Sequence, residues 1–219
     1  MSLEILYDDA DIAVVVKPTG VPVHPSPGHE KGALTDALVR LFPEMRTVGS
    51  VERPGVVHRL DVETSGVMVF AKTQRAYLSL RRAFESHQDV RKTYLAVVHG
   101  SPKKKKGTID TLLGKRADKK RMKVVEPGCE GQRAITHWEV LGHHNGVALV
   151  EFTIETGRTH QIRVHAAHLG CPILGDRLYG IADRVPRMLL HAVQLEFTHP
   201  ITGKRLKFAA EPPAEIVYA

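Results

Sequence analysis

The sequence predicts an α+β fold built on a mixed, largely antiparallel sheet. Apolar segments of strand length outnumber segments with helical periodicity, and many neighbouring strand segments are joined by turn-like sequences, as in hairpins. Hydrophobic residues make up 42% of the 219-residue chain and charged residues 25%, the balance of an ordinary globular protein. We therefore expect a single domain over residues 1–219, large enough to fold without cross-links and at most divided into two lobes that share a core.

The N-terminal part begins with two predicted strands, at residues 3–7 and 12–16, on either side of an acidic turn. A loop rich in Pro, Gly and His follows. Residues 33–42 have the pattern of a short helix, and this helix must stop before Pro43 because proline disfavours helical backbone in the residue before it.

Residues 67–71 form a short apolar strand, and an amphipathic helix follows that Thr73 can cap. The apolar face of this helix consists of Ala76, Tyr77, Leu80, Ala83 and Phe84. Residues 94–98 predict another strand, which leads into a segment with few apolar residues. That segment is expected to form a hairpin arm or a mobile loop.

The C-terminal part predicts two strand pairs and one helix. The helix covers residues 159–169 and is ended by Gly170. The strand pairs are residues 134–141 with 147–154, which turn at a His-His-Asn-Gly sequence, and residues 193–198 with 205–209.

The positive charge of the chain is concentrated in one segment, residues 101–123. The whole chain has a formal net charge of +7, this segment has +8, and the other 196 residues sum to −1. Its basic residues are Lys103, Lys104, Lys105, Lys106, Lys115, Arg116, Lys119, Lys120, Arg121 and Lys123. A basic arm on a near-neutral body suits contacts with a phosphate backbone, although a solvated loop has the same composition.

Several classes of protein do not fit the composition. No apolar run approaches the roughly 18 residues that a membrane span needs, and the first residues lack the basic and apolar regions of a signal peptide. The two cysteines, Cys129 and Cys171, can form one disulfide, but free thiols fit better in a chain without an export signal. We expect a cytoplasmic protein that does not bind membranes.

The first segment whose residues can carry chemistry is Arg-Pro-Gly-Val-Val-His-Arg-Leu-Asp-Val-Glu-Thr-Ser-Gly, at residues 53–66. It lies between turn residues and a buried strand, where a rigid scaffold can present side chains to a ligand. Asp61 can be a nucleophile or a base, and Arg59 can bind phosphate or replace a displaced base. The alternative is that Asp61 only caps the turn at residues 64–66.

The second segment is Glu-Thr-Gly-Arg-Thr-His-Gln-Ile-Arg-Val-His, at residues 155–165, where a strand runs through Gly157 into a helix. A helix N-terminus favours an anion. Helical spacing places Ile162 and His165 on the core side and Arg163 on another face. An arginine there suits a fixed bidentate partner, most simply a carboxylate, or is a surface residue without a partner.

Other chemistries find less support. His160, His165 and His168 are five and three residues apart, which differs from the four-residue spacing of zinc-binding helices, and no second cluster of ligands completes a site. The sequence has neither a Gly-rich nucleotide-binding loop nor the Gly-x-Ser-x-Gly turn of serine hydrolases.

Taken together and in this order, the motifs resemble those of the RluA-type pseudouridine synthases, which act on RNA. The resemblance covers the chain from Leu6 to about Pro212. It rests on Gly-Val-Val-His-Arg-Leu-Asp-x-x-Thr-Ser-Gly, Lys92-Thr93-Tyr94, Thr-Gly-Arg-Thr-His-Gln-Ile-Arg-Val-His, Pro172-Ile-Leu-Gly-Asp-Arg-Leu-Tyr-Gly180 and Leu189-Leu-His-Ala192.

The resemblance implies a role for particular residues. Asp61 matches the essential carboxylate of the family, and Arg163 matches the arginine that pairs with it. Tyr94 matches the tyrosine that packs against the target uracil and can carry a proton. Arg59 matches the arginine thought to fill the gap left by a flipped base. Leu190, or alternatively Leu189, matches an aliphatic residue beneath the base.

We also expect His58 to contact the RNA or its base, together with Lys103, Lys104, Lys105 and Lys106 of the basic arm. The family needs neither cofactor nor metal. Its fold is an α+β body of two sheet-based lobes with the active cleft between them. Larger relatives carry an RNA-binding domain before this body, which here begins almost at Met1, so the basic arm becomes the candidate for RNA binding.

The implied reaction turns a uridine of ribosomal or transfer RNA into pseudouridine. Whether Asp61 attacks C1′ or assists a glycal-type elimination stays open, as does the choice of RNA. Two other functions compete: an inactive RNA-binding or folding factor on the same scaffold, and a metal-dependent hydrolase built on the histidines. The first predicts a missing Asp, Tyr or Arg in the motifs. We expect a monomer without an obligate protein partner.

Overall fold

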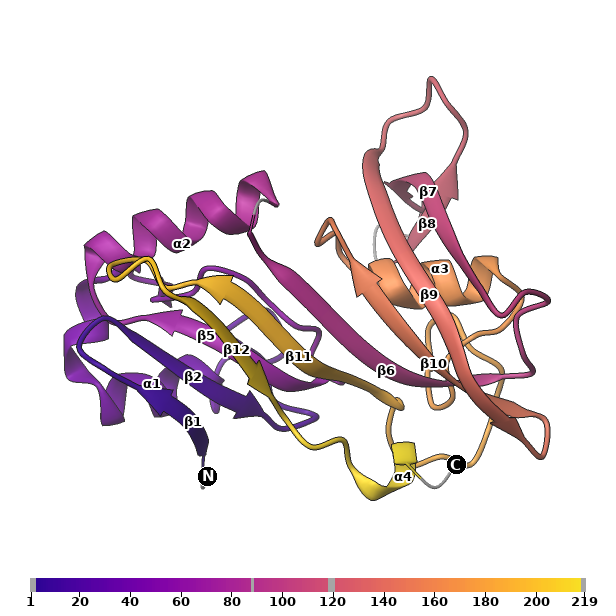
Figure 1. Cartoon of the computed structure of the whole chain (residues 1–219), viewed down its shortest axis with the longest axis horizontal. Coiled ribbons are helices and arrows are strands. Elements are labelled where there is room, and N and C mark those ends of the chain that lie inside the picture. The colour runs from indigo at the N-terminus through magenta and orange to yellow at the C-terminus, as the bar shows by residue number, and fades with distance from the viewer. Residues whose placement is uncertain (1–2, 88, 118–120, 218–219) are drawn as a thin grey trace. The chain divides into compact units, whose positions relative to one another are not determined.

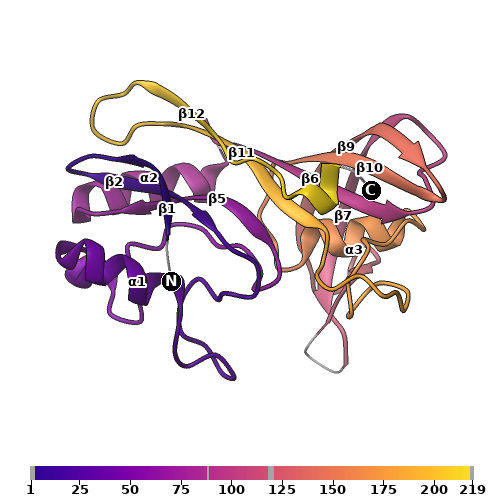
Figure 2. The same cartoon turned by 90° about the horizontal axis from the view of Figure 1, so that it is seen from below.

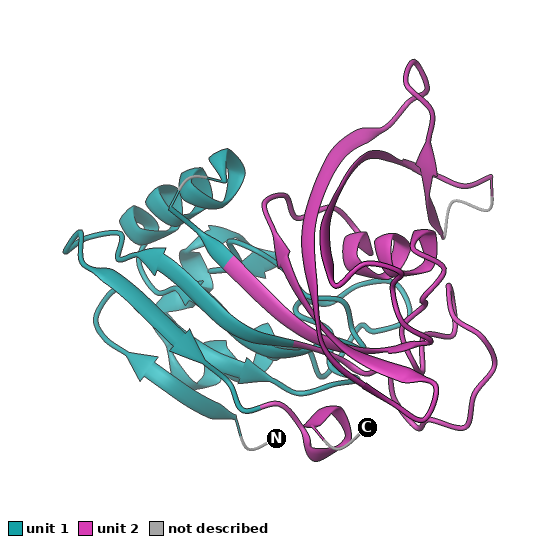
Figure 3. Ribbon diagram, turned by 45° about the vertical axis from the view of Figure 1, so that its right-hand side comes forward, with its two compact units in different colours: residues 1–91, 192–211 teal, residues 92–191, 212–219 magenta. Residues whose placement is uncertain are grey.

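The computed structural model describes residues 3–87, 89–117 and 121–217. The chain divides into two compact units (Figure 3). Unit 1 comprises residues 1–91 and 192–211, and unit 2 comprises residues 92–191 and 212–219. The predicted α+β class with a largely antiparallel sheet is confirmed, because the strand pairs whose register is given below are antiparallel and helices accompany the strands in both units.

Unit 1 has strands in the order β1-β2-β5-β11, with β12 beside β11 (Figure 1). The pairs β1–β2, β2–β5 and β11–β12 are antiparallel. The strands are β1 (Glu4–Asp8), β2 (Ile12–Lys17), β5 (Ser65–Ala71), β11 (Leu190–Thr198) and β12 (Arg205–Ala209), and a separate short pair is β3 (Gly49–Ser50) with β4 (Arg53–Pro54). The helices are α1 (Leu34–Leu41), the 3₁₀ helix η1 (Pro43–Thr47) and α2 (Gln74–Ser86).

The core of unit 1 forms where β2, β5 and β11 meet the apolar face of α2. Its buried residues include Ile12, Val14, Val67, Val69, Ala76, Leu80, Phe84, Leu195 and Phe197. All seven residues of β5 are buried, which explains why this strand is a continuous apolar run. Gly66 begins that run with a φ of +122°, and a Cβ there would overlap the backbone of Ala192.

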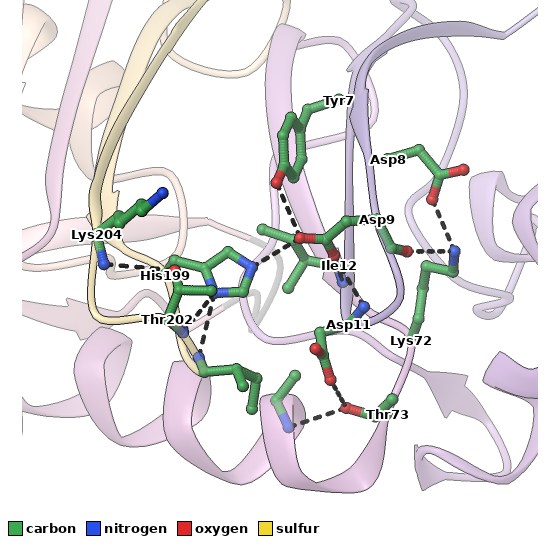
Figure 4. A network of polar contacts seen from close by, with 12 residues as sticks. Tyr7, Asp8, Asp9, Asp11, Ile12, Lys72, Thr73, His199, Thr202 and Lys204 are labelled. Carbon is green, nitrogen blue, oxygen red and sulfur yellow. Dashed lines mark hydrogen bonds and ion pairs between the residues drawn. The ribbon is translucent and has the colours of Figure 1, made fainter.

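The acidic turn between β1 and β2 is held by the carboxylate of Asp9 (Figure 4). It accepts hydrogen bonds from the backbone N–H of Asp11 and Ile12, at 2.8 and 2.9 Å, and is bonded by Tyr7 and His199, each at 2.9 Å. Burial by itself raises the pKa of Asp9, but these hydrogen bonds outweigh it and lower the pKa to about 2. The turn is thereby tied to the end of β11.

The same turn fixes the start of α2 (Figure 4). The ammonium of Lys72 donates to a carboxylate oxygen of Asp8 at 2.7 Å and to the carbonyl oxygen of Asp9 at 2.6 Å. The Thr73 hydroxyl donates to the Asp11 carboxylate at 2.9 Å and accepts the backbone N–H of Ala76, as the predicted helix cap should.

Unit 2 has strands in the order β6-β10-β9-β7-β8, and each neighbouring pair is antiparallel (Figure 1). The strands are β6 (Arg91–His99), β7 (Lys106–Lys115), β8 (Met122–Val125), β9 (Gln132–His144) and β10 (Val147–Ile154), and the helices are α3 (Gln161–His168) and α4 (Ala214–Val217). Helix α3 lies on one face of these strands (Figure 2). Val164 of α3 packs there against Leu113 and Ala134.

Most predicted elements are confirmed within a few residues, but the second chemical segment differs. The helix begins at Gln161 and not at residue 159, because His160 has a left-handed φ of 55°. Its first six residues are all buried, so the expectation that Arg163 lies away from the core side is wrong. The helix contacts the strands and also the loop of residues 172–180, and the helical spacing of its apolar residues did not reveal this second contact.

The basic segment contains a hairpin, since β7 and β8 pair from Leu112 with Val125 to Lys115 with Met122. Of its ten basic residues, Lys119 and Lys120 lie outside the described residues. Cys129 is exposed and Cys171 is buried, and both are free thiols, as predicted. In the part of the chain that the structure describes, no helix is long and apolar enough to cross a membrane.

Candidate active-site residues in the two units

Asp61 lies in unit 1, in the loop between β4 and β5, and its side chain is half-buried. The loop is anchored before Asp61 by the buried Leu60. After Asp61, the backbone N–H of Thr64 donates to the Asp61 carbonyl oxygen at 3.1 Å, which forms a tight turn. This turn fixes the backbone that carries the Asp61 side chain.

Lys17 anchors this loop through hydrogen bonds, a role that its place in the sequence did not predict. Its side chain is fully buried, and its ammonium donates to the carbonyl oxygens of Pro18, Val21 and Val62, at 2.9, 2.7 and 3.0 Å. The lysine thus connects the loop after β2 to the residue that follows Asp61. The available signal was a lysine at the end of an apolar strand.

His58 packs against the core of unit 1. Its ring stacks on Phe84, with centroids 4.5 Å apart and planes 9° apart, and its Nε2 accepts the backbone N–H of Val69 at 3.1 Å. These contacts fix the ring and require the proton on Nδ1 when His58 is neutral. They give His58 a structural role in this loop, and its predicted contact with RNA stays a prediction. Its neighbour Arg59 is exposed.

Tyr94 lies in unit 2, on β6 opposite Phe152, and only 7% of its surface is exposed. Leu189 and Leu190 are both buried. Leu189 packs in a core cluster with Val97 and Leu174, and its carbonyl oxygen accepts the backbone N–H of Val97 while its own N–H donates to the Leu174 carbonyl oxygen. Because neighbouring residues of an extended chain point to opposite sides, the Leu190 side chain points away from that cluster.

Arg163 has the fixed bidentate carboxylate partner that its position predicted. Its Nε and Nη2 donate to the two carboxylate oxygens of Asp176, both at 2.8 Å, and both side chains are almost fully buried. The Asp176 carboxylate also accepts the backbone N–H of Leu178 and Tyr179. Burial alone raises the pKa of Asp176, but Arg163 and these N–H donors lower it below its usual value.

Asp176 was missed as a partner, although it lies in one of the motifs that carry the resemblance. The signal was an aspartate between glycines in a loop, which is also typical of turns. The ring of Tyr179 from the same loop lies 5.2 Å from the Arg163 guanidinium carbon, a cation–π contact that further restricts the arginine. Asp61 belongs to unit 1 and Arg163 to unit 2, and their pairing stays a prediction.

A chain of polar side chains locks α3 onto the strands of unit 2. The buried His165 bonds the hydroxyls of Thr136 and Thr111 through its two ring nitrogens, at 2.8 and 3.0 Å. The Gln161 side chain donates to Thr136 at 2.9 Å and accepts from Thr156 at 2.7 Å. Burial, with a smaller contribution from His168, lowers the pKa of His165 to about 4, so the ring is neutral at pH 7.

Lys103, Lys104, Lys105 and Lys106 are all exposed; Lys106 begins β7 and the other three precede it. They are available to a polyanion, and an RNA contact for them stays a prediction. Within residues 3–87, 89–117 and 121–217, no group of three or more His, Cys, Asp or Glu side chains is arranged to hold a metal ion.

Comparison with known proteins identifies the family. The family model described as RNA pseudouridylate synthase matches residues 11–168. An uncharacterized RNA pseudouridine synthase of Synechocystis is 40% identical over 217 residues, which cover 97% of this chain and 66% of the relative. The ribosomal large subunit pseudouridine synthase D of Pseudomonas aeruginosa is 38% identical over 234 residues, which cover 100% of this chain and 71% of that protein.

Two solved human structures have the same fold. They are RNA Pseudouridylate Synthase Domain Containing 4, with a TM-score of 0.78 and 30% identity, and Domain Containing 1, with 0.79 and 31%. They cover 98% and 97% of this chain, and the chain covers 90% and 84% of theirs. The chain spans about two thirds of the length of the bacterial relatives named above. The chain therefore belongs to the RNA pseudouridine synthases, of the RluA type that its motifs resemble.

Proposed function

We propose that this protein isomerises a specific uridine of ribosomal or transfer RNA to pseudouridine, acting as a cytoplasmic monomer with Asp61 as the catalytic carboxylate. One observation carries the proposal: the region that matches the family model contains Asp61, Tyr94 and Arg163, each at its place in the family's motifs. An inactive factor on the same scaffold has no need to keep all three.

The reaction requires three changes at the nucleotide. The bond between C1′ and N1 breaks, the free uracil rotates, and C1′ then joins C5, after which C5 loses its proton and N1 gains one. A carboxylate can form a covalent bond to C1′, as in retaining glycosidases, or can remove a sugar proton in an elimination. Both roles require Asp61 to be ionised and held in one orientation.

Arg163 is suited to hold Asp61 in that state. Asp176 engages Nε and Nη2 of Arg163, and a guanidinium has five N–H donors in a fixed fork, so a single arginine can bind two carboxylates. In the proposed site this second carboxylate is Asp61. The contacts with Asp176 and Tyr179 fix the position of the Arg163 side chain, as a catalytic partner requires.

The uracil must leave its stack before it can react, which costs a few kcal/mol. Tyr94 offers an aromatic surface that recovers part of this cost. Leu190 is the better candidate for the aliphatic residue beneath the base, because the side chain of Leu189 is used in the core of unit 2. Arg59, exposed in the Asp61 loop, is the candidate for the gap that the base leaves.

The test is a comparison of two variants in the same loop. Carbodiimide labelling of RNA from cells with and without the gene first identifies the modified uridine. Asp61→Asn should then abolish formation of pseudouridine in the purified system while RNA affinity changes by no more than a few fold. Glu63→Gln, which removes another charge from this loop, should stay active. Near-normal turnover by Asp61→Asn, or identical pseudouridine maps with and without the gene, contradicts the proposal.

The basic arm is proposed to bind the phosphate backbone of the substrate. Its exposed lysines at residues 103–106 are not engaged in the salt bridges of the described residues. Changing all four to Gln should weaken RNA binding and reduce the slope of log affinity against log salt by up to about 3.6 units, at roughly 0.7–0.9 per phosphate contact. An unchanged slope means that these lysines serve solubility alone.

A further inference from the structure

Lys92 is a buried lysine to which the proposed reaction assigns no role. It lies on β6 opposite Ile154, and only 6% of its surface is exposed. In the described part of the chain, its ammonium has neither a hydrogen-bond acceptor nor an acidic partner. The other buried lysines differ in this respect, since Lys17 donates to three carbonyl oxygens and Lys72 pairs with Asp8.

The surroundings of Lys92 add to its positive charge. A Cβ placed on Gly157 would lie 3.8 Å from the Lys92 Nζ, so the ammonium lies beside the turn that leads into α3. The next residue of that turn is Arg158, whose Nε donates to the carbonyl oxygen of Arg133 at 3.0 Å and which is thereby oriented. Burial, and then the charge of Arg158, lower the pKa of Lys92 to about 8.

Two cations held together without an anion are unfavourable in the free protein. A buried charge without a partner destabilises the folded state, and the repulsion between Lys92 and Arg158 adds to this cost. Removing the ammonium should therefore stabilise the fold. A buried charged group that is unfavourable for folding is typical of a site that an incoming ligand completes.

We propose that Lys92 and Arg158 together bind a phosphate group of the substrate RNA, next to the nucleotide whose base contacts Tyr94. Lys92 and Tyr94 lie on the same face of β6, because they are two residues apart, and their Cα atoms are separated by roughly 7 Å. A nucleotide with its base on Tyr94 can bring its own phosphate to the ammonium. This placement rests on the proposed function, and it makes Lys92 a positioning residue.

The proposal has a pH dependence with a defined sign. Phosphate binds the protonated form of Lys92, so binding should be complete below pH 8 and should weaken as the pH rises through about 8. Bound RNA should in turn raise the pKa of Lys92. In the free protein, burial and the charge of Arg158 set the pKa of Lys92.

The experiment uses the full-length chain and three variants. Lys92→Met removes the charge and keeps most of the length, Lys92→Arg keeps the charge, and Lys207→Met removes a charge from an exposed lysine of β12 in unit 1. The probe is a fluorescein-labelled ten-nucleotide oligouridylate, whose affinity is measured by anisotropy from 50 to 300 mM salt and from pH 6.5 to 9.5. Thermal unfolding of each variant is recorded in parallel.

Lys92→Met should bind the probe about tenfold more weakly, and the slope of its log affinity against log salt should be smaller by about 0.7–0.9. Its affinity should also no longer decline around pH 8. Its melting temperature should equal or exceed that of the wild type. Lys92→Arg should keep most of the affinity without the decline around pH 8, and Lys207→Met should resemble the wild type.

Binding by Lys92→Met equal to that of Lys207→Met overturns the proposal. So does a lower melting temperature of Lys92→Met with unchanged affinity, because the ammonium then stabilises the fold. The readout is binding, so the two proposals can fail separately. If Lys92→Met binds the probe weakly but the wild type forms no pseudouridine, only the proposed function is rejected. If the wild type forms pseudouridine but Lys92→Met binds the probe normally, only the phosphate site is rejected.

Discussion

Replacing Asp176 by Asn tests whether the buried ion pair with Arg163 organises unit 2. The change keeps the size of the side chain but removes the negative charge that faces two guanidinium N–H groups at 2.8 Å. Arg163, only 3% exposed, cannot turn to solvent. Removing one partner of a buried pair costs about 3–5 kcal/mol, because the other charge stays buried without compensation. For a chain of this size, the melting temperature should fall by on the order of 10 °C.

The structure supplies a matched control in the same unit. Asp110 and Arg133 form the same bidentate pair, at 2.9 and 2.6 Å, but their side chains are 44% and 65% exposed. Solvent and salt screen an exposed pair, so Asp110→Asn should change the melting temperature little. The assay is thermal unfolding followed by circular dichroism, with urea unfolding at 25 °C as a second measure.

The double variant Arg163→Met/Asp176→Leu separates charge from packing. With both charges replaced by apolar groups of similar size, part of the lost stability should return, because no uncompensated charge is left, while the backbone N–H groups of Leu178 and Tyr179 still lose their carboxylate acceptor. Pseudouridine formation should not return, since the proposed partner of Asp61 is gone. Equal shifts for Asp176→Asn and Asp110→Asn would refute the reasoning, since burial would then not determine the cost.

Three further changes test how the two units are built. Burial lowers the pKa of His165 from 6.5 to about 4, so the unfolded chain binds more protons than the folded chain between these pH values. The contribution of His165 to the free energy of unfolding is therefore complete above about pH 6.5 and falls by on the order of 3 kcal/mol towards pH 4. His165→Gln should remove this pH dependence from urea midpoints measured between about pH 4 and pH 6.5. Thr73→Ala should lower the free energy of unfolding in urea by about 1 kcal/mol, because the helix cap is lost, whereas Thr73→Ser keeps the capping hydroxyl and should keep this stability. Equal losses in the two variants contradict the cap. Gly66→Ala should lower soluble yield and the urea midpoint, because the new Cβ meets the Ala192 backbone at a φ of +122°, whereas Gly142→Ala, with open space around it, should change neither.

The hairpins were predictable because the information they need lies in adjacent residues. The turn between β9 and β10 uses Asn145 and Gly146, with φ of 46° and 79°, and an Asn-Gly pair between apolar strands predicts this geometry. The start of α2 was predictable for the same reason, since Thr73 caps a helix whose apolar face repeats with helical spacing. The family was also predictable, because its motifs occur in a fixed order along the chain.

The partners of individual side chains were not predictable in this way. Arg163 was expected to have a carboxylate partner, but Asp176 is thirteen residues further along the chain, and a loop aspartate between glycines is equally typical of a turn. Lys17 and Lys92 are both lysines at the ends of apolar strands, and the sequence does not distinguish them. In the structure Lys17 is surrounded by carbonyl oxygens, while Lys92 lies beside another cation.

The sequence by itself determined the fold class, the order of the main strands and helices, the family and the chemical types of the candidate residues. The tertiary structure alone decided which charges are buried, which of them have partners, and that α3 is enclosed around Arg163. The physical reason is that periodicity and turn preference act between near neighbours in the chain. The energy of a charge depends on burial and on atoms within a few ångströms, which distant segments supply.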